Sequence, residues 1–217
     1  MMYKHSFWLR ASGLAGILGG LILFAGDMLI YYDPQSTDLL QNMATIPPWR
    51  FRLSTVTALL ATWFYLAGVY HVFLAFRPAP VFSHTVVAVT FAAILSAYGV
   101  VHGEFMAIAG TARIAAQQGL DLQAASGLAR SSNDLLRLWV YPVFAILSVV
   151  FIYEVWKKRT LYPRLIILFF PLFPFAFMGP LDKVLTDTAH TVILGGYLNL
   201  MLVLFFAAST VALWKER

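Results

Sequence analysis

The sequence lacks cysteine altogether and is poor in charged residues. Without cysteine, a chain has no disulfides, no thiolate metal site and no cysteine nucleophile. Asp, Glu, Lys and Arg together make up 12% of the residues, whereas about 25% is typical of soluble domains. The hydrophobic share is 60% and the mean hydropathy is +0.76, so the composition predicts an integral membrane protein.

Several sequence signatures of soluble enzymes are missing too. We find no Gly-x-Ser-x-Gly nucleophile motif and no Walker or Rossmann glycine pattern. His102 and Glu104 form a His-x-Glu pattern, which also occurs in zinc deaminases. Those enzymes need a Pro-Cys-x-x-Cys segment as well, and the absence of cysteine excludes this class. The net charge of +5 is typical of the cytoplasmic face of a membrane protein. Since there is no soluble basic domain, we expect no nucleic-acid partner.

Long apolar runs are the dominant feature of the chain. A transmembrane helix needs about 20 consecutive, mostly apolar residues. The runs predict an all-α fold, a bundle of six transmembrane helices forming one domain over residues 1–217. The first run is longer than a signal-peptide core, so we interpret it as a retained helix. The predicted spans are approximately 8–31, 51–76, 84–109, 135–156, 161–181 and 188–214.

Two connecting features complete this picture. Pro171, Pro174 and Pro180 interrupt the fifth run, and such breaks either kink a span or line a binding site.

The long connection 110–134 is rich in Ala, Gln and Leu, which favour helix. We expect it to form one or two short helices over the outer mouth, either as a lid or as a simple interfacial hairpin.

The distribution of basic residues predicts the orientation. Lys157, Lys158 and Arg159 form a cluster between two spans, which places that loop in the cytoplasm. Both termini are then cytoplasmic, in a multi-pass protein of the plasma (inner) membrane. All acids except Glu154 and Glu216 fall toward the outer side. The candidate functional residues therefore share one membrane face.

Ionisable residues in membrane spans are costly and usually face a protein interior or a cavity. Asp27 lies near the outer end of the first span, on the same stripe as Gly16 and Gly20. The glycines favour close helix packing. Asp187 and His190 are three residues apart, so they can meet on one helix face, although Asp187 is also typical of a helix cap.

The third predicted span carries a second polar group. Tyr98 and His102 are four residues apart and share a helix face. Glu104 lies about 200° around a regular helix from His102, so it reaches the same site only if the helix bends. Gly99 and Gly103 permit such a bend or a very close contact.

Our leading hypothesis is a membrane enzyme with an outward-facing pocket that acts on a lipid or other amphiphile. A metal-assisted version uses zinc or another divalent metal, and a metal-free version uses a His–carboxylate pair for acid/base chemistry. Arg50 and Arg52 either hold an anionic headgroup, pair with Asp33 or Asp38, or simply snorkel. By role, the candidates are catalytic Asp27, Glu104 and Asp187, metal-binding His102 and His190, and substrate-binding Arg50, Arg52, Tyr98 and Asn199.

Two alternatives from other classes stay open. A small proton-coupled transporter could use the same acids as a relay. A non-catalytic membrane component would use the polar cluster for helix packing alone. The inner half of the spans offers little polarity beyond His71 and Asn199, which favours a one-sided pocket.

Two short segments carry a family resemblance. They are Gly26-Asp27 and the glycine-led stretch from Gly195 to Leu200, which continues to Phe205-Phe206-Ala207-Ala208-Ser209-Thr210. Together with the span count, they resemble a bacterial family of small uncharacterised six-span membrane proteins. The resemblance implies a bacterial membrane setting and brings no assigned activity.

Overall fold

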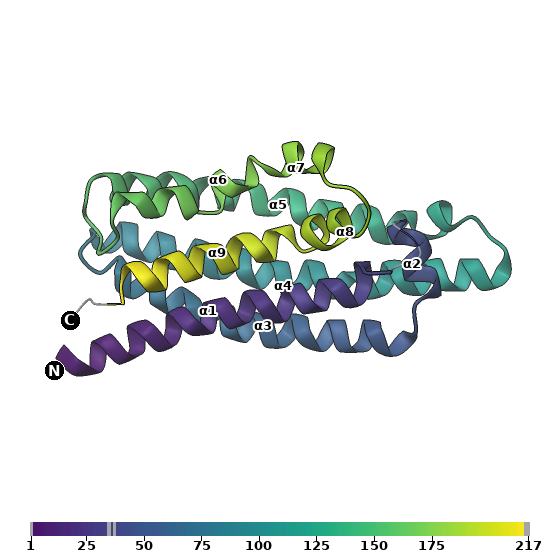
Figure 1. The fold of residues 1–217 in the computed structure, drawn as a ribbon, viewed down its shortest axis with the longest axis horizontal. Coiled ribbons are helices and arrows are strands. Elements are labelled where there is room, and N and C mark those ends of the chain that lie inside the picture. Colours follow the sequence, from purple (N-terminus) through teal and green to yellow (C-terminus); the bar gives the residue numbers. More distant parts are fainter. Residues whose placement is uncertain (1, 34–35, 37, 215–217) are drawn as a thin grey trace.

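The computed structural model describes residues 2–33, 36 and 38–214 of the chain, and every regular element in them is helical. Lys215, Glu216 and Arg217, which entered the prediction of orientation, lie outside these residues. Figure 1 shows the elements as an elongated helical bundle. They are α1 (Met2–Tyr31), α2 (Leu39–Thr45), α3 (Pro48–Ala75), α4 (Val81–Gln118), α5 (Leu122–Trp156), η1 (Arg164–Phe169), α6 (Leu172–Phe175), α7 (Met178–Val184), α8 (Asp187–Gly195) and α9 (Tyr197–Ala212).

The prediction of a helical membrane protein is confirmed. Among the described residues, α1, α3, α4 and α5 are long and apolar enough to cross a membrane, and the bent pair α8–α9 makes a fifth crossing if it counts as one span. Helix α1 packs against α3 and α9, while α4 packs between α3 and α5. The two ends of the described chain lie at the same end of the bundle (Figure 1).

The last predicted span, 188–214, is not one continuous helix. It breaks at Gly196, and α8 and α9 meet at a bend of 61°. The glycines at this break lie directly against α1, because a Cβ on Gly196 would collide with Phe24 and one on Gly195 would come 3.0 Å from Tyr31. Close approach of α1 therefore accounts for the glycines at this position.

The fifth predicted span, 161–181, is also not a continuous helix. It consists of the 3₁₀ helix η1 and the short helices α6 and α7. Helix α7 ends at Val184, three residues beyond the predicted end of the span. Proline lacks the backbone N–H and its ring clashes with the preceding turn. Pro163 and Pro171 accordingly stand immediately before η1 and α6. Figure 1 shows this broken segment running along the bundle toward α8.

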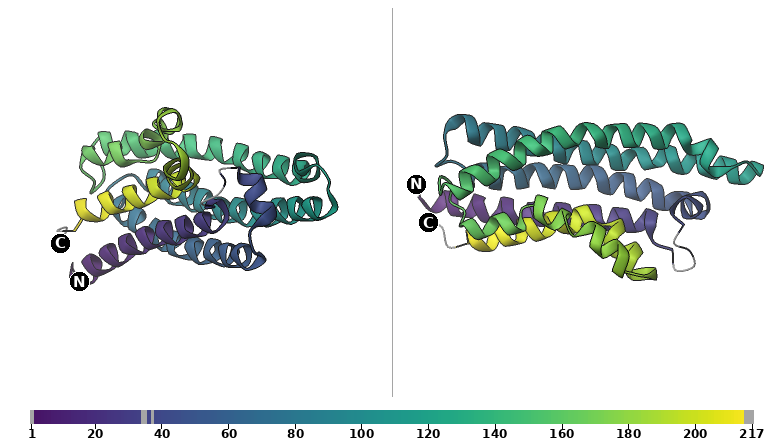
Figure 2. Two further views of the ribbon diagram at one scale, coloured as in Figure 1. Left: turned by 45° about the vertical axis from the view of Figure 1, so that its right-hand side comes forward. Right: turned by 90° about the horizontal axis from the view of Figure 1, so that it is seen from above.

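The prediction of one or two short helices over 110–134 is wrong. Helix α4 continues to Gln118 and α5 begins at Leu122, so the two long helices themselves occupy this region. They meet at Gly119, whose φ of +67° ends α4 in the left-handed conformation that glycine tolerates. The Asp121 side chain accepts a hydrogen bond from the Ala124 N–H and caps α5. The α4–α5 hairpin projects beyond α1 and α3 (Figure 2).

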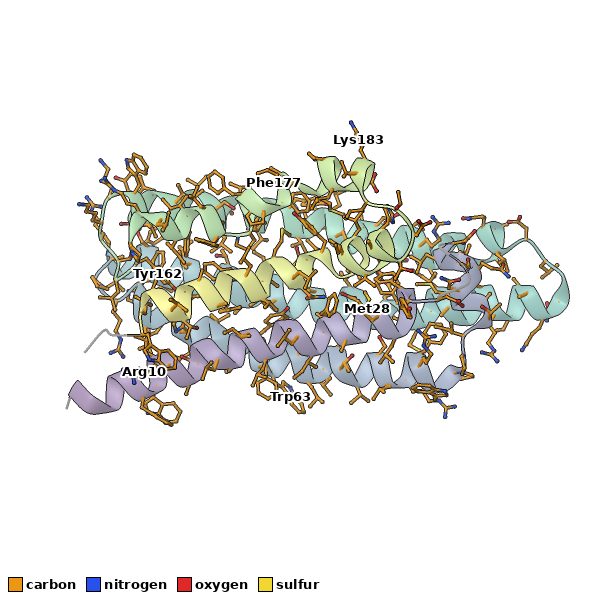
Figure 3. The ribbon with its side chains drawn as sticks, in the orientation of Figure 1. Arg10, Met28, Trp63, Tyr162, Phe177 and Lys183 are labelled. Carbon is orange, nitrogen blue, oxygen red and sulfur yellow. The ribbon has the colours of Figure 1, made fainter. Side chains whose placement is uncertain are left out.

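The apolar interior is divided into two clusters. The larger one fills the bundle and includes Tyr65, Phe91 and Phe206. The smaller one lies where α2 packs against the projecting hairpin, and Met43 and Phe105 belong to it. Figure 3 shows Trp63 and Phe177 pointing outward, and both are more than half exposed. Such an apolar outer surface fits contact with lipid.

Glycines let α1 approach its neighbours, as the sequence predicted. A Cβ on Gly16 would overlap the Phe206 ring of α9, and one on Gly20 would overlap Val203. Gly68 of α3 meets the Gly16 backbone directly, so that a Cβ there would lie 2.7 Å from the Gly16 Cα. These contacts hold α1 between α3 and α9 and so determine the depth at which Asp27 lies.

Candidate functional site

A cavity of about 340 Å³ opens between α1, α4, α5 and the α8–α9 break. The α6–α7 segment contributes Phe175 and Met178 to its wall. Of the nine residues that the sequence singled out, five line this cavity, and they come from three separate parts of the chain. They are Asp27, Tyr98, His102, His190 and Asn199.

The Asp27 carboxylate is the centre of the buried part of the site. Asp27 is 6% exposed, and its Oδ1 lies 3.1 Å from His102 Nδ1. Its Oδ2 accepts a 2.6 Å hydrogen bond from Asn199 Nδ2. Asn199 is in turn oriented by Tyr65, whose hydroxyl donates to Asn199 Oδ1 at 2.8 Å. Both carboxylate oxygens therefore have partners, as burial in an apolar surrounding requires.

The other side of the His102 ring contacts Ser54. His102 Nε2 lies 2.6 Å from Ser54 Oγ, and Ser54 Oγ lies 2.9 Å from the Gly26 carbonyl oxygen. A Cβ on Gly26 would overlap Thr57 and lie 3.4 Å from His102 Nε2. Gly26 therefore lets α1 approach α3 and α4 closely enough to bring Asp27 to His102.

This chain of contacts is compatible with two proton counts. If the Ser54 hydroxyl donates to the Gly26 carbonyl, His102 Nε2–H must donate to Ser54, and a further proton lies between Nδ1 and Asp27. If Ser54 donates to Nε2 instead, it no longer donates to the Gly26 carbonyl, and Nδ1–H donates to an ionised Asp27. The two arrangements differ by one proton and by the acceptor to which the Ser54 hydroxyl donates. A group of this kind can take up and release a proton with only a rotation of the Ser54 hydroxyl.

Ser54, His102 and Asp27 have the connectivity of a serine-hydrolase triad. Ser54 does not have the position of a nucleophile, however. It is 1% exposed and does not line the cavity, which His102 and Asp27 do. Its role in this arrangement is to orient the His102 ring.

His190 takes a different partner from the one that the sequence suggested. Its Nε2 lies 2.8 Å from Asp182 Oδ1, on α7. Asp187 begins α8 with a φ of +52° and is exposed. The side chain of His190 is 40% exposed and lines the cavity wall. The His190–Asp182 pair is therefore a surface pair at the rim and not part of the buried network.

Three further candidates lie away from the cavity. Arg50 Nη2 donates to the carbonyl oxygens of Met28 and Tyr32, which satisfies free carbonyl groups where α1 ends. Arg52 is exposed and does not line the cavity. Glu104 does not line it either, because α4 stays regular through Gly103 and keeps the two side chains on different faces.

The metal-assisted version of the hypothesis finds no support in these positions. Within the part of the chain that the structure describes, no three His, Asp or Glu side chains come together as a metal-binding group. His102 is already engaged through both ring nitrogens, and His190 pairs with Asp182.

Sequence reasoning missed Arg137 as a cavity residue. It comes from α5 and lines the same cavity as Asp27. The signal in the sequence was its place at the outer start of an apolar run, four residues after Asn133. Its Nε donates to Asn133 Oδ1 at 2.9 Å, an i to i+4 contact along one helix face.

An apolar slot of about 60 Å³ continues from the cavity between α4, α5, α6 and α9. The slot and the cavity share wall residues, so they are neighbouring spaces. Phe91, Phe144 and Met201 extend the slot away from the polar group. The shared residues are Tyr98, Val140, Tyr141, Phe175 and Leu198.

The chain belongs to a family of unknown function, DUF6796, whose model matches residues 4–216. The match therefore covers nearly the whole chain, including every residue of the cavity wall. No curated protein and no solved structure matches it.

Proposed function

We propose that this protein is a membrane-embedded enzyme that performs metal-free acid/base chemistry on a lipid or other amphiphile. The observation that carries the proposal is the buried Asp27–His102 pair at the wall of a cavity that continues into an apolar slot. The polar end of an amphiphile would lie at the pair and its apolar end in the slot. Proton transfer by a positioned pair typically accelerates a reaction by about 10²–10⁴-fold.

In this proposal Asp27 and His102 share one transferable proton. Asn199 holds Oδ2 of Asp27, and Ser54 holds Nε2 of His102, so the proton moves between Oδ1 and Nδ1. The beginning of α9 also lies at this point, and the positive end of a helix dipole stabilises a carboxylate. The pair can therefore accept a proton from a bound group in one step and return it in the next.

A one-sided enzyme pocket fits the packing better than a transporter does. Phe91, Phe205 and Phe206 pack together with ring centroids 5.4–6.0 Å apart. All three are almost completely buried. They occupy the bundle beyond Asn199, toward the end that carries the termini, where a transporter would need a second opening.

For the membrane orientation, we propose the topology that the basic residues predict. Both termini lie in the cytoplasm of a bacterium, and the cavity lies toward the outer leaflet of the inner membrane. The chain then crosses six times if η1, α6 and α7 make the fifth crossing and the bent pair α8–α9 the sixth. The common end of the described termini in Figure 1 supports an even number of crossings.

The absence of cysteine makes this topology testable by single-cysteine labelling. Thr160→Cys places a thiol in the basic loop, and Gln118→Cys places one on an exposed residue at the end of α4, near the tip of the projecting hairpin. An impermeant maleimide added to intact cells should label the second variant and not the first. Labelling of Thr160→Cys alone would reverse the proposed orientation.

The activity itself is tested with purified protein, without added metal, incubated with a bacterial membrane lipid extract. Mass spectrometry follows every lipid class. We expect one class to be converted by the wild-type protein, with or without chelator, and conversion to slow by about 100-fold or more in Asp27→Asn and His102→Gln.

His84→Gln is the matched control, because His84 is on the same helix as His102 and its ring packs on Phe73, away from the cavity. It should convert lipid at the wild-type rate. Equal rates in all variants would contradict the role of the pair. Uptake of an amphiphile into liposomes without conversion would favour the transporter, and loss of conversion with chelator would favour a metal.

A further inference from the structure

The Arg137 guanidinium is held rigidly at the boundary of the cavity. Its Nε donates to Asn133 Oδ1 at 2.9 Å, and Asn133 Nδ2 donates to the Val101 carbonyl oxygen at 2.8 Å. Asn133 is 3% exposed. The guanidinium carbon also lies 5.7 Å from the centroid of the Phe105 ring. One edge of the guanidinium is therefore fixed by the protein.

The charge of Arg137 is not neutralised by an ion pair. Among the described residues, no Asp or Glu oxygen lies within 4.0 Å of its nitrogens. A guanidinium presents its donors as a planar fork that matches the oxygens of phosphate or carboxylate. Nε is engaged by Asn133, and the Tyr31 hydroxyl lies within hydrogen-bonding reach of the guanidinium. The remaining N–H groups of the two terminal nitrogens are the donors available to a ligand.

Arg137 also lies between two cavities. A second cavity of about 430 Å³ lies between α2 and the projecting α4–α5 hairpin. Tyr31, Leu39, Phe105 and Arg137 line both cavities. The rest of the second lining is mixed, with Leu40, Met43 and Ile108 beside a polar set made up of Asp38, Gln123, Arg130, Asn133 and Asp134.

The slot and the two cavities are arranged in the same order as the parts of an amphiphile with a charged headgroup, from its apolar tail to its polar end. The apolar slot lies on one side of the first cavity, the Asp27–His102 pair lies in its wall, and Arg137 stands where it joins the polar outer cavity. The outer cavity is lined by two acids, Asp38 and Asp134, and by two arginines, Arg130 and Arg137. Of these four charged residues, Arg137 alone reaches the first cavity.

We propose that Arg137 binds a phosphate group of the ligand, with the apolar tail in the slot and the remaining headgroup in the outer cavity. This inference rests on the proposed function, because it names the substrate class of the same site: a phosphate-bearing amphiphile. Free inorganic phosphate carries the same chemistry, and the experiment separates the two sources.

The test measures binding and not turnover. The full chain in neutral detergent is titrated with short-chain phosphatidic acid, with diacylglycerol of the same chains and with inorganic phosphate. We expect the wild-type protein to bind phosphatidic acid about 10–100-fold more tightly than diacylglycerol. Arg137→Gln should lose this preference, and Arg137→Lys should keep part of it because it retains the charge without the fork.

Arg77→Gln is the matched control, since Arg77 is exposed and lines neither cavity nor the slot. It should bind as the wild type does. Inorganic phosphate that binds as tightly as phosphatidic acid would support the phosphate site and assign it to a soluble ligand. Equal binding of phosphatidic acid and diacylglycerol, or an unchanged preference in Arg137→Gln, would overturn the proposal. Should Arg137→Gln fail to fold, Arg137→Lys decides.

The outcome is separable from that of the proposed function. Asp27→Asn removes the shared proton site and leaves Arg137 in place, so it should keep the preference for phosphatidic acid. If no lipid is converted while this preference is present, the enzyme proposal fails and the phosphate site stands. If lipid is converted without any phosphate preference, the phosphate site fails and the enzyme proposal stands.

Discussion

Among the residues whose burial the structure describes, two histidines are buried, and their surroundings differ in one decisive respect. His71 is completely buried, with Nδ1 2.7 Å from the Leu9 carbonyl oxygen and Nε2 2.6 Å from Ser209 Oγ. Ser209 is also 2.7 Å from the Tyr162 hydroxyl. A neutral ring satisfies all of these contacts, because Nδ1–H donates to Leu9 and Ser209 donates to Nε2.

His102 is equally well hydrogen-bonded, but one of its partners is a carboxylate. The protons of its network can be arranged in two ways that differ by one proton, whereas the His71 network is complete with a neutral ring. His102 also lines a cavity, and His71 lines neither of the two cavities nor the slot. Burial of a histidine therefore does not by itself distinguish a structural ring from a functional one. The distinction depends on whether a carboxylate is among its hydrogen-bond partners and whether the ring lines a cavity.

The largest expected contrast comes from Asp27→Asn. Lipid conversion should fall by about 10²–10⁴-fold, because the shared proton is lost. Thermal unfolding in detergent should change little, since an amide of the same shape replaces a buried carboxylate. Loss of folding together with activity would mean that the Asp27 network is mainly structural.

His71→Ala should have the opposite profile. It leaves Ser209 and the Leu9 carbonyl without their partner and removes a fully buried ring, at a cost of about 2–4 kcal/mol. The unfolding midpoint should fall clearly, while phosphatidic acid binding by the protein that remains folded should be unchanged. A strong loss of binding at wild-type stability would remove the distinction between the two histidines.

Tyr65→Phe weakens the Asp27 network without touching Asp27 itself. The Asn199 amide loses the hydroxyl that orients it, so its bond to Asp27 becomes less well defined. One such hydrogen bond contributes about 1 kcal/mol, which corresponds to roughly a fivefold loss in conversion rate. An unchanged rate would show that Asn199 holds Asp27 without help from Tyr65.

Tyr162→Phe makes the smallest change and tests the His71 side. It removes the hydroxyl contact to Ser209 and leaves the Ser209–His71 bond in place. We expect a loss of about 1 kcal/mol in unfolding free energy and no change in lipid conversion. A greater effect than that of His71→Ala would place the centre of this network at Tyr162.

The polar network illustrates what could be predicted and what could not. Asp27, His102 and Asn199 stand out in the sequence because polar groups in apolar spans need a partner. Their mutual pairing could not be deduced, since it depends on Gly26 and Gly196 bringing three distant helices together. Ser54 and Tyr65 gave no sequence signal, because single hydroxyls are common in membrane helices.

The limits of local patterns appear most clearly at Asp187 and His190. Their spacing predicts a shared helix face, but α8 begins at Asp187 itself, and His190 turns to Asp182 of another helix. The broken path through η1, α6 and α7 brings Asp182 there. Hydrophobicity locates such a segment well, but it does not specify how prolines divide it.

The sequence by itself determined the class of the protein, the apolar runs on which its four long helices are built and the polar residues that require protein contacts. Apolar length and the cost of burying charge depend on the local sequence, so they can be predicted. The tertiary structure decided which of those residues meet, that Arg137 joins them, and that the last span breaks at the cavity. These features arise from close approach of helices that are far apart in the chain, and periodicity within one helix contains no information about its neighbours.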